Sequence, residues 1–230
     1  SLVIRTGDGS DNVVLDLSGQ GSITINSVVH SIDRPFSSIT VDGGPGNDSL
    51  EIIGSLKDER FIARASLTSV DQVLATLQSP GFEGSFTSFE AIVFRGGGGN
   101  DRATLFDSAG DDTFEATATS ATLRGVGFSF TAIGVNNVYA HGTSGGSDTA
   151  FLYDSPQNDR LAIRHQFTSL RSDDLFRLAY GFEKVHAFAG NGGIDHADLY
   201  DSPGDDRMSA SSAAAWISGR DYYAGARGFH

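Results

Sequence analysis

The chain contains no cysteine, and only one methionine, one tryptophan and five prolines among its 230 residues. The lack of cysteine excludes a disulfide framework, thiolate zinc sites and thiol catalysis. Positive charge is also scarce, with 16 Lys and Arg against 29 Asp and Glu and a net charge of -13. A field of that sign repels phosphate backbones, so we expect no nucleic-acid partner. The same charge suits high solubility or bound cations.

Long apolar runs are missing as well. No stretch approaches the length of a membrane span, so we expect no membrane insertion. The sequence has neither an initiator methionine nor a signal-peptide pattern at Ser1. We therefore expect a processed product or an excised segment of a longer protein.

The most informative pattern is a repeat of 47 residues. Its clearest copy runs from Gly97 to Phe114 and reads GGGNDRATLFDSAGDDTF. The residues that recur in phase are Asp101, Asp148 and Asp195, Leu105, Leu152 and Leu199, Asp107, Asp154 and Asp201, and Asp112, Asp159 and Asp206. Several residues in one phase indicate a repeat protein.

We expect a single domain over residues 1–230, built from five approximate repeats. These are 5–42, 43–95, 96–142, 143–189 and 190–230. Gly228-Phe229 lies 47 residues after Gly181-Phe182, so the chain stops where another strand should begin. The sequence thus predicts a segment of a longer array, whose partners are the neighbouring repeats of the same chain.

Local patterns predict an all-β fold. Residues 151–153, 161–163 and 185–188 are short, rich in strand formers and bounded by Gly, Asp, Asn and Ser. The best helix candidate is a single short segment, Asp71–Gln78. Turn signals fall about four times in each repeat, as at Asp148, Asp159, Asp173 and Gly181, which predicts about four strands per repeat.

Two architectures fit this pattern, a β-solenoid (parallel β-helix) and a five-bladed β-propeller. We favour the solenoid, because the copies are unevenly spaced and the last one lacks a closing strand. The in-phase leucines should then point into the core. Phe89, Phe182, Tyr153 and Tyr200 also recur in phase and are expected to form interior stacks between coils.

The glycine-aspartate turn carries a resemblance to a known family. Gly43–Glu51, GGPGNDSLE, resembles the GGxGxDxUx nonapeptide of the calcium-binding RTX, or hemolysin-type, repeats. The likeness extends to Gly96–Asp101 and Gly190–Asp195, although that family stacks nonapeptides back to back and each repeat here offers only one. The resemblance implies left-handed glycines and calcium held by carbonyls and aspartates.

We therefore expect Ca²⁺ as the cofactor. The candidate ligands are Asn47, Asp48, Asp101, Asp107, Asp112, Asp148, Asp154, Asp159, Asp195, Asp201 and Asp206. If the turns stack along one edge of a solenoid, their carboxylates approach one another there and need a cation. The alternative is that Asp and Ser only cap tight turns through backbone hydrogen bonds, without metal.

As a whole, the chain is similar to the long-period GGxDxAxLYDSxGDD arrays of large secreted or surface bacterial proteins of planctomycete type. That likeness covers residues 97–230 well and the first 96 poorly. It implies an extracellular or cell-surface location. We expect a structural or adhesive module, with extracellular polysaccharide or other surface proteins as possible partners.

The second hypothesis is a carbohydrate-active β-helix, such as a polysaccharide lyase, hydrolase or epimerase, or a sugar-binding module. Acids that recur in every repeat indicate a structural role, because a catalytic site needs one distinct environment. An active site should therefore consist of residues that break the repeat. The candidates are His165, Lys184, His186, Trp216 and Tyr222-Tyr223. They form no known catalytic constellation, so we expect no catalytic residues and no enzyme.

Overall fold

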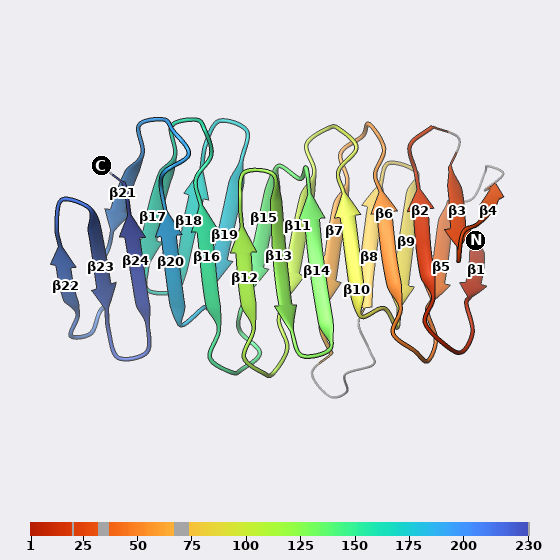
Figure 1. The fold of residues 1–230 in the computed structure, drawn as a ribbon, viewed down its shortest axis with the longest axis horizontal. Helices are drawn as coiled ribbons and strands as arrows, with labels where there is room; N and C mark the ends of the chain where they lie inside the picture. The colour runs from red at the N-terminus through yellow and green to blue at the C-terminus, as the bar shows by residue number, and fades with distance from the viewer. Residues whose placement is uncertain (20, 32–36, 67–73, 230) are drawn as a thin grey trace.

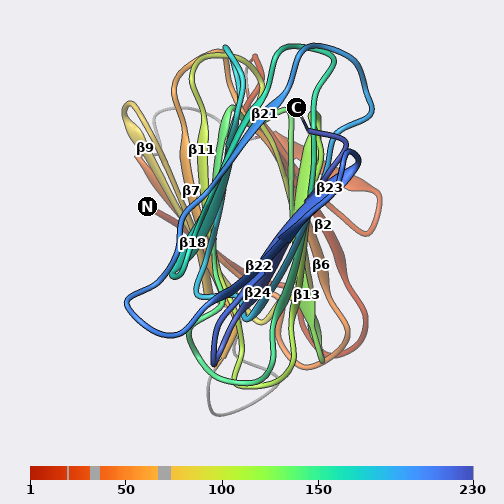
Figure 2. The same ribbon diagram turned by 90° about the vertical axis from the view of Figure 1, so that its left-hand side faces the viewer.

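The computed structural model describes residues 1–19, 21–31, 37–66 and 74–229, and this part of the chain forms 24 β-strands. The strands make two sheets that face each other across a shared core (Figures 1 and 2). They lie across the long axis of the molecule, and the two termini lie at opposite ends of that axis (Figure 1). The predicted all-β solenoid is confirmed. The described residues contain no helix long and apolar enough to cross a membrane.

One sheet has 11 strands and the other 13. In order across the 11-stranded sheet lie β1 (Leu2–Arg5), β5 (Ser38–Asp42), β9 (Phe82–Thr87), β8 (Leu74–Ser79), β7 (Arg60–Arg64), β11 (Arg102–Phe106), β15 (Asn137–His141), β19 (Phe176–Tyr180), β18 (Phe167–Arg171), β17 (Arg160–Arg164) and β21 (His196–Leu199). In order across the 13-stranded sheet lie β22 (Arg207–Ala210), β23 (Ala214–Ser218), β24 (Tyr223–Arg227), β20 (Lys184–Phe188), β16 (Thr149–Tyr153), β12 (Thr113–Ala116), β13 (Ser120–Gly125), β14 (Phe128–Ile133), β10 (Ala91–Arg95), β6 (Ser49–Ile53), β2 (Asn12–Asp16), β3 (Ser22–Ile25) and β4 (Val28–Ser31).

Each full repeat contains five strands rather than the four expected. In one repeat β15 and β16 lie in opposite sheets, and β17, β18 and β19 then form an antiparallel meander within the 11-stranded sheet. The turn that the sequence did not reveal is His165-Gln166, which joins β17 to β18 and contains no Gly, Pro, Asn or Asp. In the preceding repeat the hydroxyl of Thr117 closes this turn by accepting the N–H of Ser120 at 3.1 Å.

Successive repeats exchange the two sheets. The chain crosses between the sheets three times per repeat, and because three is odd, the next repeat starts in the opposite sheet. The meander β12–β14 therefore belongs to the 13-stranded sheet, β17–β19 to the 11-stranded sheet, and β22–β24 to the 13-stranded sheet again. Residues 47 apart thus occupy opposite sheets, and only residues 94 apart share one.

The core consists of the inward-facing side chains of both sheets. Leu105 in β11 and Leu152 in β16 are fully buried on opposite sides of it, whereas Leu199 in β21 is partly buried. Phe61 of β7 stacks on Phe94 of β10 across the two layers, with ring centroids 5.1 Å apart. Alternation along each strand places one face in the core and the other in solvent.

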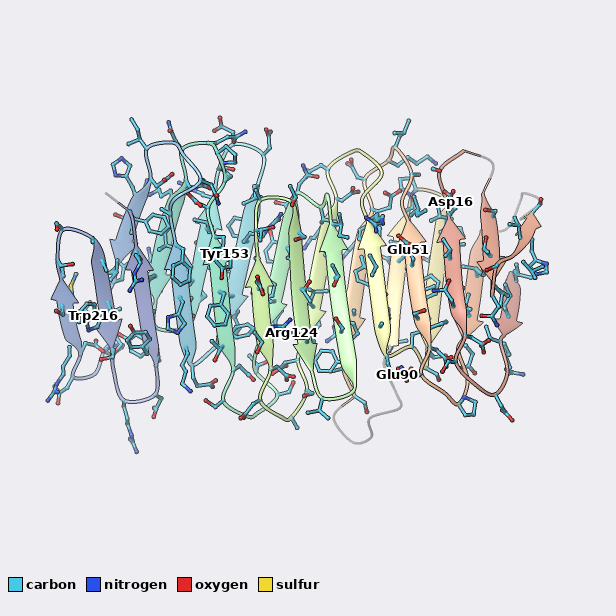
Figure 3. The ribbon with its side chains drawn as sticks, viewed as in Figure 1. Asp16, Glu51, Glu90, Arg124, Tyr153 and Trp216 are labelled. Atoms are coloured by element: carbon cyan, nitrogen blue, oxygen red, sulfur yellow. The ribbon has the colours of Figure 1, made fainter. Side chains whose placement is uncertain are left out.

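Of the four aromatic side chains predicted to stack in the interior, two are buried there and two are not. Phe89 and Phe182 are buried in the core. Tyr153 and Tyr200 instead lie on the outer faces, because each follows an inward-facing leucine and successive strand residues point to opposite faces. Tyr153 stacks there on Phe188, with centroids 5.3 Å apart (Figure 3 shows this face).

The predicted helix is wrong where the structure describes it. Leu74–Gln78 lies in strand β8, and residues 71–73 lie outside the described part of the chain. β8 pairs antiparallel with both β7 and β9, and it buries Ala75 and Leu77. Pairing on both sides outweighs the weak local helix propensity of this short segment.

Among the residues that the structure describes, a single charged side chain is fully buried between the two sheets, that of Arg177. Arg177 of β19 occupies the position that the preceding repeat fills with Phe130. Its guanidinium donates to the backbone carbonyls of Thr117, Ala118, Val135, Asn136 and Phe176. Desolvation lowers the pKa of Arg177 to about 10, so the group remains charged at neutral pH.

Leu105→Ala and Leu152→Ala should each lower the free energy of unfolding by about 2–5 kcal/mol, because each leaves a cavity in a closed core. The substitutions act on opposite sheets and should have similar effects. Leu199→Ala should have a smaller effect, since Leu199 is only partly buried. Urea denaturation measures all three. Leu56→Ala is the matched control, because Leu56 is 85% exposed, and an effect of Leu105→Ala as small as the control's would contradict the burial.

Candidate metal centre

Four of the loops that join the two sheets, those before β7, β12, β17 and β22, share one local structure. In the loop between β11 and β12, Ser108 donates its backbone N–H and its hydroxyl to Asp112 Oδ2, at 2.8 and 2.9 Å. The N–H of Gly110 donates in turn to the Ser108 hydroxyl at 3.2 Å. Ser155 and Asp159 repeat the arrangement one repeat later. These bonds hold the last acid of each loop with its carboxylate turned back under the turn.

A second carboxylate comes from the neighbouring loop, and the backbone links the two. In four equivalent places, the N–H of the last loop acid donates to an aspartate that precedes a strand of the next coil. The pairs are Asp11 to Asp48 at 2.7 Å, Glu59 to Asp101 at 2.8 Å, Asp112 to Asp148 at 2.8 Å, and Asp159 to Asp195 at 2.9 Å. Residues 36 to 42 positions apart in sequence are therefore brought side by side.

Each of these bonds is the first step of a ladder, by which we mean a series of hydrogen bonds from backbone N–H groups to acidic or amide side chains of the next coil. Three of the four ladders continue by one further step. The N–H of Asp48 donates to Glu90 at 2.6 Å, and that of Asp148 donates to Glu183 at 2.7 Å. In the copy between them, the N–H of Asp101 donates to the amide oxygen of Asn136 at 3.1 Å. Three of the four ladders thus connect three consecutive coils by bonds from backbone N–H groups to acidic or amide side chains.

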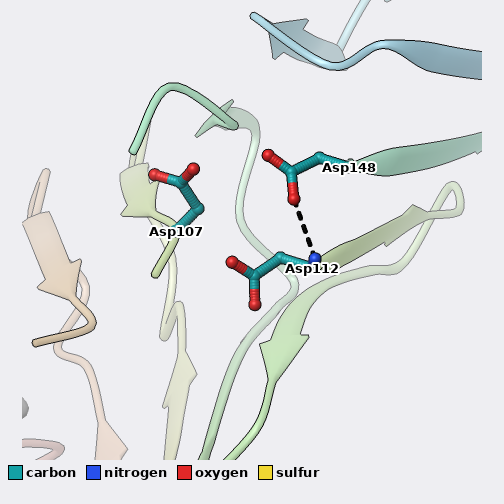
Figure 4. Close-up of side chains that lie close together, drawn as sticks. All are labelled: Asp107, Asp112 and Asp148. Atoms are coloured by element: carbon teal, nitrogen blue, oxygen red, sulfur yellow. Dashed lines mark hydrogen bonds between the residues drawn. The ribbon is translucent and has the colours of Figure 1, made fainter. Parts of the chain in front are cut away.

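The densest cluster is Asp107, Asp112 and Asp148 (Figure 4). All three side chains are buried, and one oxygen from each lies within 4.8 Å of the others. Asp107 is fixed by the N–H and hydroxyl of Ser144, at 2.8 and 2.6 Å. Burial, reinforced by the neighbouring carboxylates, raises the pKa of Asp148 to about 7 and also raises that of Asp112.

The equivalent clusters contain buried carboxylate oxygens that no described group satisfies. They are Asp11 Oδ2, Asp48 Oδ2, Glu59 Oε2, Asp101 Oδ2 and Asp159 Oδ1. Burial also raises the pKa of Asp101 to about 6. An unsatisfied buried acceptor costs about 1–3 kcal/mol, and more when it is charged. Paired oxygens of this kind fit a bound cation, which would supply the missing partner.

One copy reaches the same arrangement with different residues. The position of Asp107 is taken there by Gly54, and the position of Asp112 by the longer Glu59. A Cβ on Gly54 would lie 2.8 Å from Glu59 Oε2, so the missing side chain makes room for the longer acid. Likewise, a Cβ on Gly96 would lie 2.4 Å from Asp101 Oδ2. Some glycines of these turns therefore leave the space that a carboxylate occupies, in addition to allowing the backbone conformation of the turn.

The structure brings together most of the predicted ligands. The buried ones are Asp48, Asp101, Asp107, Asp112, Asp148, Asp154, Asp159 and Asp195. Asn47 and Asp201 are exposed, and Asp206 is half-buried. Asp206 accepts the N–H of Ser202, which lowers its pKa, and the hydroxyl of Tyr222 at 2.9 Å.

Sequence reasoning missed Asp11, Glu59, Glu90 and Glu183 as members of these clusters. Asp11 follows glycines and resembles Asp101 in its local sequence, but it occupies the position of Asp112. Glu90 and Glu183 each follow a phenylalanine just before a strand, and only the pairing of successive coils shows that they contact the ladders.

The clusters do not form one row. The loops after β1 and β11 lie at one edge between the sheets, and those after β6 and β16 at the other, because successive repeats exchange sheets. Along one edge, equivalent loops are five strands apart, about 24 Å at ~4.8 Å per strand. This distance exceeds the screening length of about 8 Å. Carboxylates of successive coils do approach one another as expected, but they do so within separate clusters at both edges rather than in one row.

Most residues that break the repeat lie away from these clusters. Lys184, His186, Trp216 and Tyr223 share the outer face of the 13-stranded sheet near β22–β24. His186 and Trp216 line an open depression of about 330 Å³, which no carboxylate lines. His165 is exposed and meets the edge of the Tyr222 ring. The pair of carboxyl groups that polysaccharide hydrolysis requires is not assembled in that depression.

In chelator, the melting temperature should fall as the pH rises from about 5 to 8. The folded-state pKa values of Asp101 and Asp148, about 6 and about 7, lie above the ordinary value of 3.8, so protonation favours the folded state. That stability is lost as the pH rises through those values. Asp148→Asn, an uncharged isostere, should flatten the fall, while Asp173→Asn in an exposed loop should leave it unchanged. A slope unaffected by Asp148→Asn would contradict the shift.

No protein-family model matches the chain, and no curated protein matches its sequence. The assignment of the clusters therefore rests on the geometry and chemistry of these side chains.

Proposed function

We propose that this chain is a calcium-stabilised structural or adhesive module of a large secreted or cell-surface protein. The observation that carries the proposal is the repetition of paired carboxylates at four equivalent places, three of which contain buried oxygens that no described group satisfies. Calcium prefers oxygen ligands and tolerates irregular coordination, whereas magnesium demands a near-ideal octahedron. Carboxylates and turn carbonyls of this kind suit the larger ion.

Each ion would join successive coils. In the densest cluster, Asp107 and Asp112 belong to the loop after β11, and Asp148 belongs to the loop before β16. A cation between them removes the repulsion of the desolvated carboxylates and ties two coils together. Because every cluster spans coils in this way, bound ions would stabilise the array as a whole rather than a single loop.

The regularity of the clusters supports a structural role over a catalytic one. A catalytic site needs a distinct environment, whereas these ladders recur with the same donor and acceptor geometry. Calcium at millimolar concentration is typical outside cells, which agrees with the extracellular location that the resemblance to secreted arrays implies. The expected partners are neighbouring repeats, other surface proteins or polysaccharide.

Millimolar calcium should raise the melting temperature well above its value in chelator, and magnesium should raise it less. A ligand bound only by the folded state adds RT ln(1 + [L]/Kd), about 2.7 kcal/mol at a hundredfold excess over Kd. Asp48→Ala and Asp101→Ala should each remove part of the gain, because each deletes a buried carboxylate with an unsatisfied oxygen.

The matched control for these variants is Asp173→Ala, which removes the same charge from an exposed loop and should keep the full gain. Differential scanning calorimetry provides the measurement. Identical melting curves in calcium and in chelator would show that these aspartates only cap turns.

A further inference from the structure

Positive charge gathers on one face of this acidic protein. The outward-facing residues of the seven strands from β7 to β21 in the 11-stranded sheet include only one acid, Asp198. The same strands present six exposed arginines, Arg60, Arg64, Arg102, Arg160, Arg164 and Arg171. The chain has a net charge of -13, so this positively charged face differs in sign from the protein as a whole.

The register of the sheet places four of these arginines in two pairs. Arg60 lies directly opposite Arg102, and Arg160 lies directly opposite Arg171. Like charges directly opposite each other destabilise a sheet. Asp198 binds Arg160, at 2.9 and 2.7 Å, and the other five arginines make no ion pair with any residue that the structure describes. The pairs are therefore left with unneutralised positive charge.

Aromatic rings hold three of the guanidinium groups in place. Arg64 lies over Phe106 at 3.6 Å from the ring centre, Arg102 over Tyr139 at 4.0 Å, and Arg164 over Tyr200 at 3.7 Å. Stacking fixes the plane of a guanidinium while its edge keeps N–H donors for a planar anion. Preorganised arginines of this kind bind carboxylate or sulfate with less loss of side-chain entropy.

A row of aromatic rings lies between the two arginine pairs, on β11, β15 and β19. Phe106 stacks on His141, with centroids 4.6 Å apart and planes 11° from parallel, and His141 contacts Tyr180 at 5.6 Å. The row crosses two strand spacings, from β11 to β19, about 10 Å at ~4.8 Å each. These rings contact one another, so they form a flat, rigid floor.

We propose that this face of the 11-stranded sheet binds a linear anionic polysaccharide, whose carboxylate or sulfate groups are held by the two arginine pairs. Arg102 and Arg171 are three strand spacings apart, about 14 Å, which suits a chain with spaced charges. A nucleic acid fits less well, because its dense phosphates would also meet the acidic clusters at both edges of the sheet. The rings already stack on one another and are not free to take bases.

The test compares two double variants with the same change in charge. R102Q/R171Q removes one arginine from each pair, and R124Q/R227Q removes two exposed arginines from the outer face of the other sheet. Calorimetric titration in millimolar calcium uses hyaluronate as the carboxylate probe, dextran sulfate as the sulfate probe, and uncharged dextran. We expect R102Q/R171Q to bind at least one charged probe roughly tenfold more weakly or worse, each tenfold being about 1.4 kcal/mol, with R124Q/R227Q close to wild type and no binding of dextran.

The choice between the two charged probes identifies the anionic group. Equal weakening by both double variants would overturn the proposal, since it would mean that binding follows net charge alone. So would the absence of binding to both charged probes, or tighter binding of a single-stranded oligonucleotide of equal charge. The melting gain in calcium is measured on the same samples, so failure of this proposal is distinguishable from failure of the calcium proposal.

Discussion

The structure depends on the hydrogen bond from a backbone N–H of one loop to a buried carboxylate of the next. Parallel coils can stack only if their turns bend sharply and keep the same register, and each ladder fixes both. Asp112 shows how this works: its own carboxylate is held by Ser108, while its N–H donates to Asp148 in the next coil. The local turn and the contact between coils are therefore one network. Burial makes that network specific, and it also concentrates negative charge where water is excluded.

The balance of charge on the surface follows from this arrangement. Acids gather at the loops along both edges, because the loops need acceptors for backbone N–H groups. The faces of the sheets carry no such demand, and there the side chains alternate between core and solvent. Arginines and aromatic rings can accumulate on a face without disturbing the turns, as Arg64 and Phe106 do on the 11-stranded sheet. A strongly acidic composition thus coexists with a basic surface.

The sequence was sufficient to predict the fold class and most of the acidic residues that form the clusters. Both predictions depend on the repeat period and on the residue types of the turns, which can be read directly from the sequence. It was insufficient wherever pairing between distant strands decided the outcome. The turn at His165-Gln166 carries no turn residue, so the fifth strand and the exchange of sheets stayed hidden. Glu59 was missed because its role depends on the missing side chain of Gly54. The outward position of Tyr153 required the strand register, in which a shift of one residue reverses the face.

The strands lie across the long axis, so their hydrogen bonds run along it, between termini at opposite ends (Figure 1). A tension applied through the two ends therefore acts along those bonds and peels strands away one at a time, instead of shearing many together. Every released meander would lengthen the chain by three strands and leave the remaining coils intact. The carboxylate ladders lie at both edges and also join neighbouring coils. An ion bound within a ladder would therefore resist the separation of those coils. Such a module would yield stepwise under load, and a step would need more force where an ion is bound.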